Sequence, residues 1–365
     1  MNKHIRNIFS ILSMVFICSV ATAQLPINWI DPLNEGVLQG RLADNDITGY
    51  NRLPDSVKSV VREPVWALGT NNAGVYVNFK TNAKEIQVRY TVSGALDMPH
   101  MPKTGVSGLD LYASNNNGEW YWTPGDYRFK DTITYSFGPV KENSHRIYRL
   151  YLPLYNTVTW MEIGVSSDAT IEFQKEEESP IIIYGTSIAQ GGCASRPGLA
   201  WSNLLGRALN TPVINLGFSG NGRLEKPIID LIANTPSRVI ILDCLPNLTG
   251  VTPENTERID SLIQAAVYQL RASQPNTPIV LTDHSSGFNK NILDETDNTL
   301  YEQTTQAGLA SFEKLKQAGV KNLYHLRNAD IALDINSTVD YAHPNDFGMV
   351  KISDAYQRLI EQFLR

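Results

Sequence analysis

The chain of 365 residues is poor in cysteine, with three in all. Two of them, Cys193 and Cys244, lie outside the N-terminal segment discussed below, and two are too few for a disulfide-held scaffold. Basic blocks are lacking, and the net charge is −6, so neither nucleic acid nor an anionic membrane surface is an expected partner. Internal repeats are lacking as well, which argues against solenoids and propellers.

Long apolar runs are also lacking, apart from one near the N-terminus. Two basic residues precede a mostly apolar stretch, Ile8–Val20, that is too short to span a bilayer. Ala21-Thr22-Ala23 then supplies small residues for cleavage, so residues 1–23 are predicted to be a signal peptide. A lipoprotein signal at Cys18 is the alternative, but the residue before it is bulky. We expect an exported protein, periplasmic or extracellular, without membrane insertion.

Residues 24–175 carry a pattern typical of β-strands. Short runs alternate apolar and polar side chains, as strands do when one face packs and the other meets water. Many short strands separated by turn residues predict an all-β sandwich or jelly-roll domain. The clearest runs are Val75–Phe79, Ile86–Val92, Leu109–Tyr112, Trp120–Trp122, Thr132–Tyr135, Ile147–Leu152 and Val158–Ile163.

The periodicity changes after a short acidic linker, and residues 176–365 are predicted to form a second domain. Continuous apolar runs, typical of strands buried on both faces, now alternate with helical patterns. This alternation predicts an α/β fold with a doubly wound parallel sheet. The strand candidates are Pro180–Tyr184, Val213–Leu216, Arg238–Leu242, Pro278–Leu281 and Leu323–Leu326, and the helical candidates are Trp201–Leu209, Pro227–Ala233, Asn255–Ser273, Leu300–Ala318 and Asn345–Leu364.

The end of the first of these buried strands carries a candidate nucleophile. Gly185-Thr186-Ser187-Ile188 follows the apolar run, and ligands of open α/β sheets bind beyond the carboxyl ends of the strands. A serine nucleophile needs a base that takes its proton. His343 lies in a loop before the last helical stretch, and Asp340, three residues earlier, is placed to orient the imidazole.

Hydrogen-bond donors for an oxyanion are also available at this edge. The loop after the second strand contains glycines at 217, 220 and 222, which let a backbone N–H approach a ligand. The loop after the third strand contains Asn247, whose side chain offers an amide. Each residue has a structural interpretation too, because serine and asparagine cap helices and glycine serves turns. The convergence of four loops on one sheet edge favours catalysis.

These residues resemble the blocks of the SGNH/GDSL hydrolases, at Ser187, Gly220, Asn247 and His343. Thr186 stands where the family has Asp, and Leu245-Pro246-Asn247 departs from the usual Gly-x-Asn-Asp. Neither change removes a group that performs chemistry. Gly108-Leu109-Asp110-Leu111-Tyr112 is similar to the Gly-x-Asp-Leu-Tyr signature of a subgroup with an N-terminal β domain.

The resemblance implies a flavodoxin-like hydrolase domain and a serine esterase. It assigns the nucleophile to Ser187, the base to His343, the orienting carboxylate to Asp340, and the oxyanion hole to the N–H groups of Ser187 and Gly220 with the Asn247 side chain. It implies no metal and no organic cofactor. Related two-domain groups are carbohydrate esterases, so the expected substrate is an acetylated polysaccharide or oligosaccharide.

Several alternatives stay open at this point. A lipid or thioester could replace the sugar ester, and a binding protein with a silent hydrolase domain would need no activity. Cys193 and Cys244 lie in two active-site loops, and a disulfide between them is one hypothesis. Asp110 belongs either to the interface between the domains or to a substrate cleft. Asp283-His284 fits no zinc pattern and is interpreted as loop structure.

Overall fold

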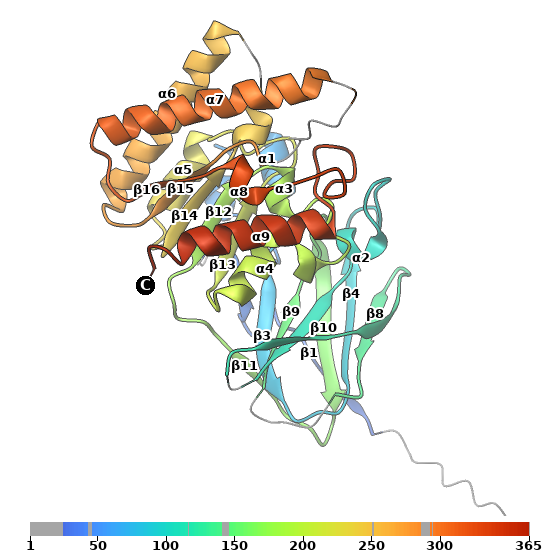
Figure 1. The fold of residues 1–365 in the computed structure, drawn as a ribbon. Helices are drawn as coiled ribbons and strands as arrows, with labels where there is room; N and C mark the ends of the chain where they lie inside the picture. Colours follow the sequence, from blue (N-terminus) through green and yellow to red (C-terminus); the bar gives the residue numbers. More distant parts are fainter. Residues whose placement is uncertain are drawn as a thin grey trace, which may run out of the picture.

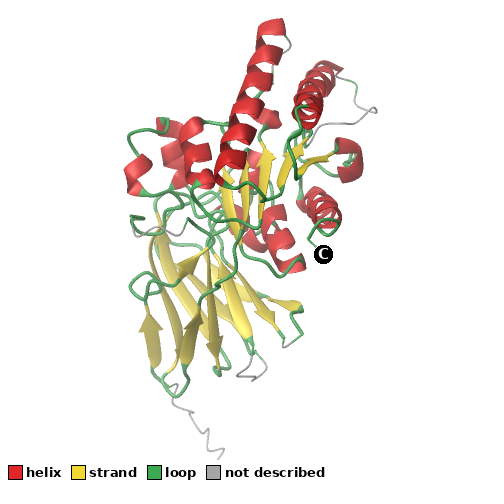
Figure 2. Ribbon diagram, turned by 90° about the vertical axis from the view of Figure 1, so that its left-hand side faces the viewer, coloured by secondary structure: helices red, strands yellow, loops and turns green. Residues whose placement is uncertain are grey.

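A computed structural model describes residues 25–42, 46–115, 117–140, 146–249, 252–285, 293 and 295–364. The predicted signal peptide lies outside these residues. Strands fill one end of the molecule, and helices that flank a further sheet fill the other (Figures 1 and 2). In the described part of the chain, no helix is both long and apolar enough to cross a membrane.

The first end is an all-β unit of two antiparallel sheets, as predicted. One sheet has the order β1-β10-β4-β8-β7, and the other has the order β11-β3-β9-β5-β6, with β2 beside β3. The strands are β1 (Ile27–Ile30), β2 (Leu38–Gln39), β3 (Tyr76–Thr81), β4 (Ile86–Val92), β5 (Asp110–Ser114), β6 (Trp120–Thr123), β7 (Gly125–Arg128), β8 (Ile133–Phe137), β9 (Ile147–Tyr151), β10 (Val158–Ser166) and β11 (Ile171–Gln174).

Side chains from both antiparallel sheets meet in one apolar core. Val77 and Leu111 come from one sheet, Val88 and Ile163 from the other, and all four are buried. Burying an aliphatic side chain of this size contributes about 1.5–3 kcal/mol. The period of two in the sequence therefore identified the inward face of each strand.

The second end is a parallel sheet with helices on both faces, as predicted (Figure 2). Its order, β13-β12-β14-β15-β16, is the flavodoxin-like order 2-1-3-4-5. The strands are β12 (Ile181–Gly185), β13 (Val213–Gly217), β14 (Val239–Asp243), β15 (Ile279–Thr282) and β16 (Leu323–Leu326), and the helices are α3 (Ser187–Gln190), α4 (Trp201–Ala208), α5 (Lys226–Ala233), α6 (Pro253–Ser273), α7 (Glu295–Gln317), α8 (Asn328–Ile331) and α9 (Asp346–Ile360).

Successive residues of β12 supply two different cores. Ile182 and Tyr184 pack with α5, α6 and α7, whereas Ile181 and Ile183 pack with α4 and α9. Because neither face of this strand meets water, neither face needs polar side chains, which explains the continuous apolar run of β12.

A segment before β3 packs against the parallel sheet, although no hydrophobic period predicted an element there. It contains the 3₁₀ turn η1 (Asp55–Val57) and helix α1 (Glu63–Gly69). Leu53 and Val65 are fully buried in the cluster that also holds α5 and α6. Arg52 is fully buried nearby, and its guanidinium donates to the carbonyls of Asn215 and Gly217 at 2.8 and 3.0 Å. The two ends of the molecule therefore share a core.

The structure contradicts the hypothesis of a disulfide. Cys193 and Cys244 are both free and buried. Cys244 packs in the cluster on one face of the parallel sheet, where its thiol donates to the carbonyl of Tyr184 at 3.4 Å. Cys193 packs in the cluster on the other face. The two loops start from neighbouring strands, but the sulfur atoms enter different cores.

Candidate functional site

Ser187 lies where β12 gives way to α3. The strand ends at Gly185, and the next residue, Thr186, has an extended backbone. The side-chain oxygen of Thr186 caps α3 by accepting from the N–H of Ile188 at 3.4 Å. The short helix ends at Gly191, whose φ of +114° is open to glycine but strained for other residues. Ser187 is 8 % exposed, so most of the residue is buried at this edge of the sheet.

The loop before α9 forms a tight hairpin that carries His343 and Asp340. The N–H of Val339 donates to the carbonyl of His343 at 2.9 Å, and the N–H of Asn345 donates to that of Ser337 at 3.0 Å. Asn345 then caps α9 by accepting from the N–H of Gly348 at 3.1 Å. The hairpin is therefore anchored to the helix that follows it, which fixes the backbone position of His343.

The three predicted triad residues form one hydrogen-bonded chain. Ser187 Oγ lies 2.8 Å from His343 Nε2, and His343 Nδ1 lies 2.8 Å from Asp340 Oδ2. Because a carboxylate accepts at Nδ1, that nitrogen carries the proton and leaves Nε2 free to accept from the serine hydroxyl. Geometrically, this is the arrangement of nucleophile, base and orienting acid.

Asp340 keeps its charge although it is partly covered. Partial burial alone would raise the pKa of its carboxyl, but the backbone N–H and the imidazole of His343 both donate to it, and the net effect lowers the pKa. A carboxylate that stays ionised at neutral pH can stabilise the imidazolium that forms during proton transfer.

The glycine loop and the Asn247 loop are held together at the same edge. The N–H of Phe218 donates to the carbonyl of Gly185 at 3.0 Å, which seats the glycine loop on the end of β12. Asn247 Nδ2 donates to the carbonyl of Asn221 at 2.6 Å, which joins the two loops. The structure thus brings the segments of Gly220 and Asn247 to the strand that precedes Ser187.

Sequence reasoning missed further groups at this site, and two of them, Tyr155 and His100, come from the β end. Tyr155 Oη donates to the carbonyl of Ser187 at 3.1 Å, and the exposed His100 ring lies 5.9 Å from the ring of His343. Gln190, itself fully buried, accepts from the N–H of Ser219 at 2.9 Å and donates to the carbonyl of Leu154 at 3.2 Å. No local motif marks Tyr155 or His100, since both reach the site only through the packing of the two ends.

Other candidates near the edge have different surroundings. Burial, with a contribution from Asp340, raises the pKa of the Cys193 thiol to about 12, which leaves it protonated and a poor nucleophile. Asp283 accepts from the N–H of Asn328 at 2.8 Å, and its other oxygen lies 2.8 Å from His325 Nε2. These contacts hold the loop after β15 in place, which agrees with the interpretation of Asp283-His284 as loop structure. Within the described ranges, no cluster of three or more His, Cys, Asp or Glu is arranged to hold a metal.

Comparisons with known proteins agree with this geometry. Residues 178–361 match the model of the GDSL-like lipase/acylhydrolase family, and residues 27–171 match that of the N-terminus of SGNH-hydrolase-type esterases. No curated protein matches the sequence.

Solved structures share the two-part architecture. A putative GDSL-like lipase from Bacteroides ovatus is 29 % identical, with a TM-score of 0.83 over 93 % of this chain and 98 % of its own. The salicylyl-acyltransferase SsfX3 from a tetracycline biosynthetic pathway is 19 % identical, with a TM-score of 0.74 over 93 % and 98 %. An acetyl xylan esterase from the rumen bacterium Butyrivibrio proteoclasticus is 12 % identical, with a TM-score of 0.54 over 92 % and 99 %. Through its match over residues 178–361, the chain belongs to the GDSL-like lipase/acylhydrolase family.

Proposed function

We propose that the protein is an exported serine esterase that removes small acyl groups, acetyl above all, from a polysaccharide or oligosaccharide. The observation that carries the proposal is the chain of two 2.8 Å hydrogen bonds from Ser187 through His343 to Asp340. In this proposal residues 1–23 direct export, residues 24–175 form the β domain, and residues 176–365 form the hydrolase domain.

The reaction begins when His343 Nε2 takes the proton of the Ser187 hydroxyl as its oxygen attacks the ester carbonyl. Asp340 stabilises the imidazolium that results. The imidazolium then gives the proton to the departing sugar alcohol, which leaves an acyl group on Ser187. Water hydrolyses this acyl-enzyme, with His343 again as the base, and the carboxylic acid is released.

The oxyanion that forms in each half of the reaction needs donors fixed in advance. We assign these donors to the backbone N–H groups of Ser187 and Gly220 and to the side chain of Asn247. Asn247 gives one amide hydrogen to the carbonyl of Asn221, which orients the side chain and leaves the second hydrogen for the substrate. Loss of one such donor typically costs about 3–4 kcal/mol of transition-state stabilisation.

The carbohydrate substrate rests on the family and on its structural neighbours. An acetyl xylan esterase is among the structures that share the fold, and a family two carbohydrate esterase from Clostridium thermocellum was solved with cellohexaose. The exposed imidazole of His100 beside His343 also provides a polar rim that suits a hydroxyl-rich leaving group better than a lipid.

The test compares p-nitrophenyl acetate, butyrate and octanoate as substrates for the wild type and Ser187→Ala. We expect kcat/KM to be highest for acetate, to fall with chain length and to drop to background in the variant, because the nucleophile is lost. Ser261→Ala, which makes the same change at an exposed position on α6 whose hydroxyl donates to the carbonyl of Glu257 in its own helix, is the matched control and should retain activity. A preference for octanoate would indicate a lipid substrate, and full activity of Ser187→Ala would refute the assignment.

A further inference from the structure

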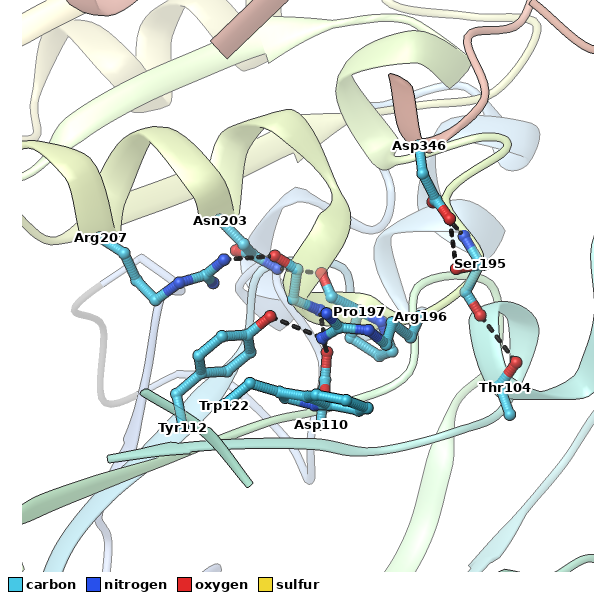
Figure 3. A network of polar contacts seen from close by, with 11 residues as sticks. Thr104, Asp110, Tyr112, Trp122, Ser195, Arg196, Pro197, Asn203, Arg207 and Asp346 are labelled. Carbon is cyan, nitrogen blue, oxygen red and sulfur yellow. Dashed lines mark hydrogen bonds and ion pairs between the residues drawn. The ribbon is translucent and has the colours of Figure 1, made fainter. Parts of the chain in front are cut away.

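Asp110, the acid of the Gly-x-Asp-Leu-Tyr signature, is buried at the junction of the two ends. It is the first residue of β5, and its side chain is 4 % exposed. The carboxylate accepts from Trp122 Nε1 at 2.6 Å, from the N–H of Gly198 at 2.9 Å and from the guanidinium of Arg196 (Figure 3). Two of these three donors belong to the loop that follows α3, so the signature contacts the hydrolase end directly.

The remaining residues of the signature complete this contact. Leu111 is fully buried in the β core, which fixes β5, and a side chain at Gly108 would collide with the carbonyl of Thr104. Tyr112 Oη accepts from Arg196 at 2.5 Å. Gly198 matches this surface from the other side, because a Cβ there would lie 2.3 Å from the Tyr112 ring. Signature and loop are therefore fitted to each other.

Trp122 covers the ion pair from the side. Its ring lies under the guanidinium of Arg196, with the carbon of that group 4.3 Å from the ring centroid (Figure 3). An aromatic face and a carboxylate together hold the guanidinium in one orientation. Because a buried carboxylate is costly unless it is paired and hydrogen-bonded, these partners also explain why Asp110 is tolerated.

The same loop contacts the segment of the catalytic histidine. The N–H of Cys193 donates to the carbonyl of Pro344, next to His343, at 2.8 Å. The N–H and hydroxyl of Ser195 donate to the carboxylate of Asp346, on the first turn of α9, at 2.8 and 2.6 Å (Figure 3). The loop at 193–198 thus lies between Asp110 on one side and the His343 hairpin on the other.

We propose that Asp110 is a positioning residue for the esterase reaction: through Arg196 and Gly198 it holds the loop at 193–198 against the hairpin that carries His343. This inference rests on the proposed function. In this proposal the β domain contributes to catalysis by fixing the position of His343. General-base catalysis requires about 2.6–3.2 Å between the hydroxyl and the imidazole, and a displacement of about 1 Å can cost up to about 10²-fold in rate.

The test measures kcat and KM for p-nitrophenyl acetate in Asp110→Asn, Arg196→Gln and the double variant. We expect each single variant to lose about tenfold or more in kcat, with KM within about twofold of wild type, because the small substrate touches neither residue. The double variant should be no slower than the slower single variant, because both changes break the same contact. Trp122→Phe, which removes only one donor to Asp110, should give a smaller loss in kcat.

The matched control is another ion pair of the β domain, between Arg89 and Glu162 on neighbouring strands β4 and β10. Glu162→Gln should change the melting temperature without changing kcat. The proposal is overturned if Asp110→Asn lowers the melting temperature but keeps kcat within twofold, or if the two single losses multiply in the double variant. If Asp110→Asn does not fold, Arg196→Gln and Trp122→Phe decide by the same criterion.

Failure of the proposed function gives a different result. In that case the wild type itself turns over no ester, or Ser187→Ala retains full activity. A wild type that is active through Ser187, together with unaffected Asp110 and Arg196 variants, refutes only the positioning role.

Discussion

Asp243 is a fully buried carboxyl group that the proposed mechanism does not use. It ends β14, in register with Gly185 at the end of β12. Burial raises the pKa of Asp243 to about 7, although the hydroxyls of Ser285 and Tyr356 act in the opposite direction. The ordinary value of 3.8 applies to the unfolded chain. Between these two values the folded protein holds a proton that the unfolded protein releases, so this carboxyl makes folding less favourable as the pH rises.

Replacement by the neutral isostere should remove this pH dependence. The penalty grows as the pH rises from the unfolded value of 3.8 toward about 7, and it is fully developed at higher pH. We therefore expect Asp243→Asn to melt at a higher temperature than the wild type at pH 8, with the difference shrinking toward pH 5. Melting temperatures measured across this range by calorimetry check the prediction. A variant that melts lower at every pH would instead show that the carboxyl group of Asp243 stabilises the fold in a way that the amide cannot replace.

Asp334 is a control for the same experiment, because its pKa is lowered and not raised, so its effect on stability changes with pH in the opposite direction. Hydrogen bonds from Lys351, Asn336 and Ser337 lower the pKa of Asp334 to about 2. Such a group stabilises the fold above its unfolded value and loses that contribution as the pH falls toward the folded one. Asp334→Asn should therefore lower the melting temperature at neutral pH, and the difference should shrink in acid.

At the scale of single elements, the glycine loop after β13 shows why two glycines of one motif are not equivalent. Gly220 and Gly222 both have positive φ, +67° and +72°. A Cβ on Gly220 would meet nothing within 4 Å, whereas one on Gly222 would lie 2.0 Å from the carbonyl oxygen of Gly185. The first position needs glycine for its backbone angle alone, and the second also for the close approach to the strand before Ser187.

These two positions form a matched pair of variants. Gly220→Ala keeps its N–H and meets only backbone strain of about 1–2 kcal/mol, so it should melt slightly lower with kcat within about threefold of wild type. Gly222→Ala must push the loop away from β12 and should lose at least about tenfold in kcat, because the oxyanion donors move with the loop. Turnover of p-nitrophenyl acetate and the melting temperatures distinguish the two effects. Equal losses in both variants would contradict this interpretation.

Most elements could be predicted because each one buries a periodic face. The helix expected over 255–273 is α6 (Pro253–Ser273), and that expected over 201–209 is α4 (Trp201–Ala208). The four site loops were also predictable, because parallel strands end at one edge and must bring their following loops together. The short helix α1 was not predicted, since its seven residues carry no clear period and owe their conformation to the core they enter.

At the scale of the whole molecule, contacts between the two ends could not be predicted from either half alone. Arg196 and Asp110 are 86 positions apart, and Tyr155 reaches Ser187 across 32. Such contacts depend on how two finished surfaces meet, which no local pattern encodes. The signature around Asp110 was recognised from the sequence, but its role in contacting the loop at 193–198 emerged only from the packing.

The shared core leads to a prediction about separating the two ends. In a chain cut to residues 176–365, the apolar cluster on one face of the parallel sheet would lose Leu53 and Val65, which are fully buried in the intact protein. The carbonyls of Asn215 and Gly217 would lose the guanidinium of Arg52 just before the glycine loop. Exposed apolar surface of this kind promotes aggregation, and unpaired strand-end carbonyls loosen the loop.

We therefore expect residues 176–365 expressed alone to be poorly soluble and to lack esterase activity, in contrast to residues 24–365. Soluble yield, near-ultraviolet circular dichroism and turnover of p-nitrophenyl acetate measure the difference. Arg52→Met in the longer chain is the milder comparison, and it should lower the melting temperature by leaving buried carbonyls without their donor. A hydrolase half that folds alone and keeps the wild-type kcat would mean that the β end only adds binding surface, whereas recovery of activity when the two halves are mixed would confirm that the site needs both.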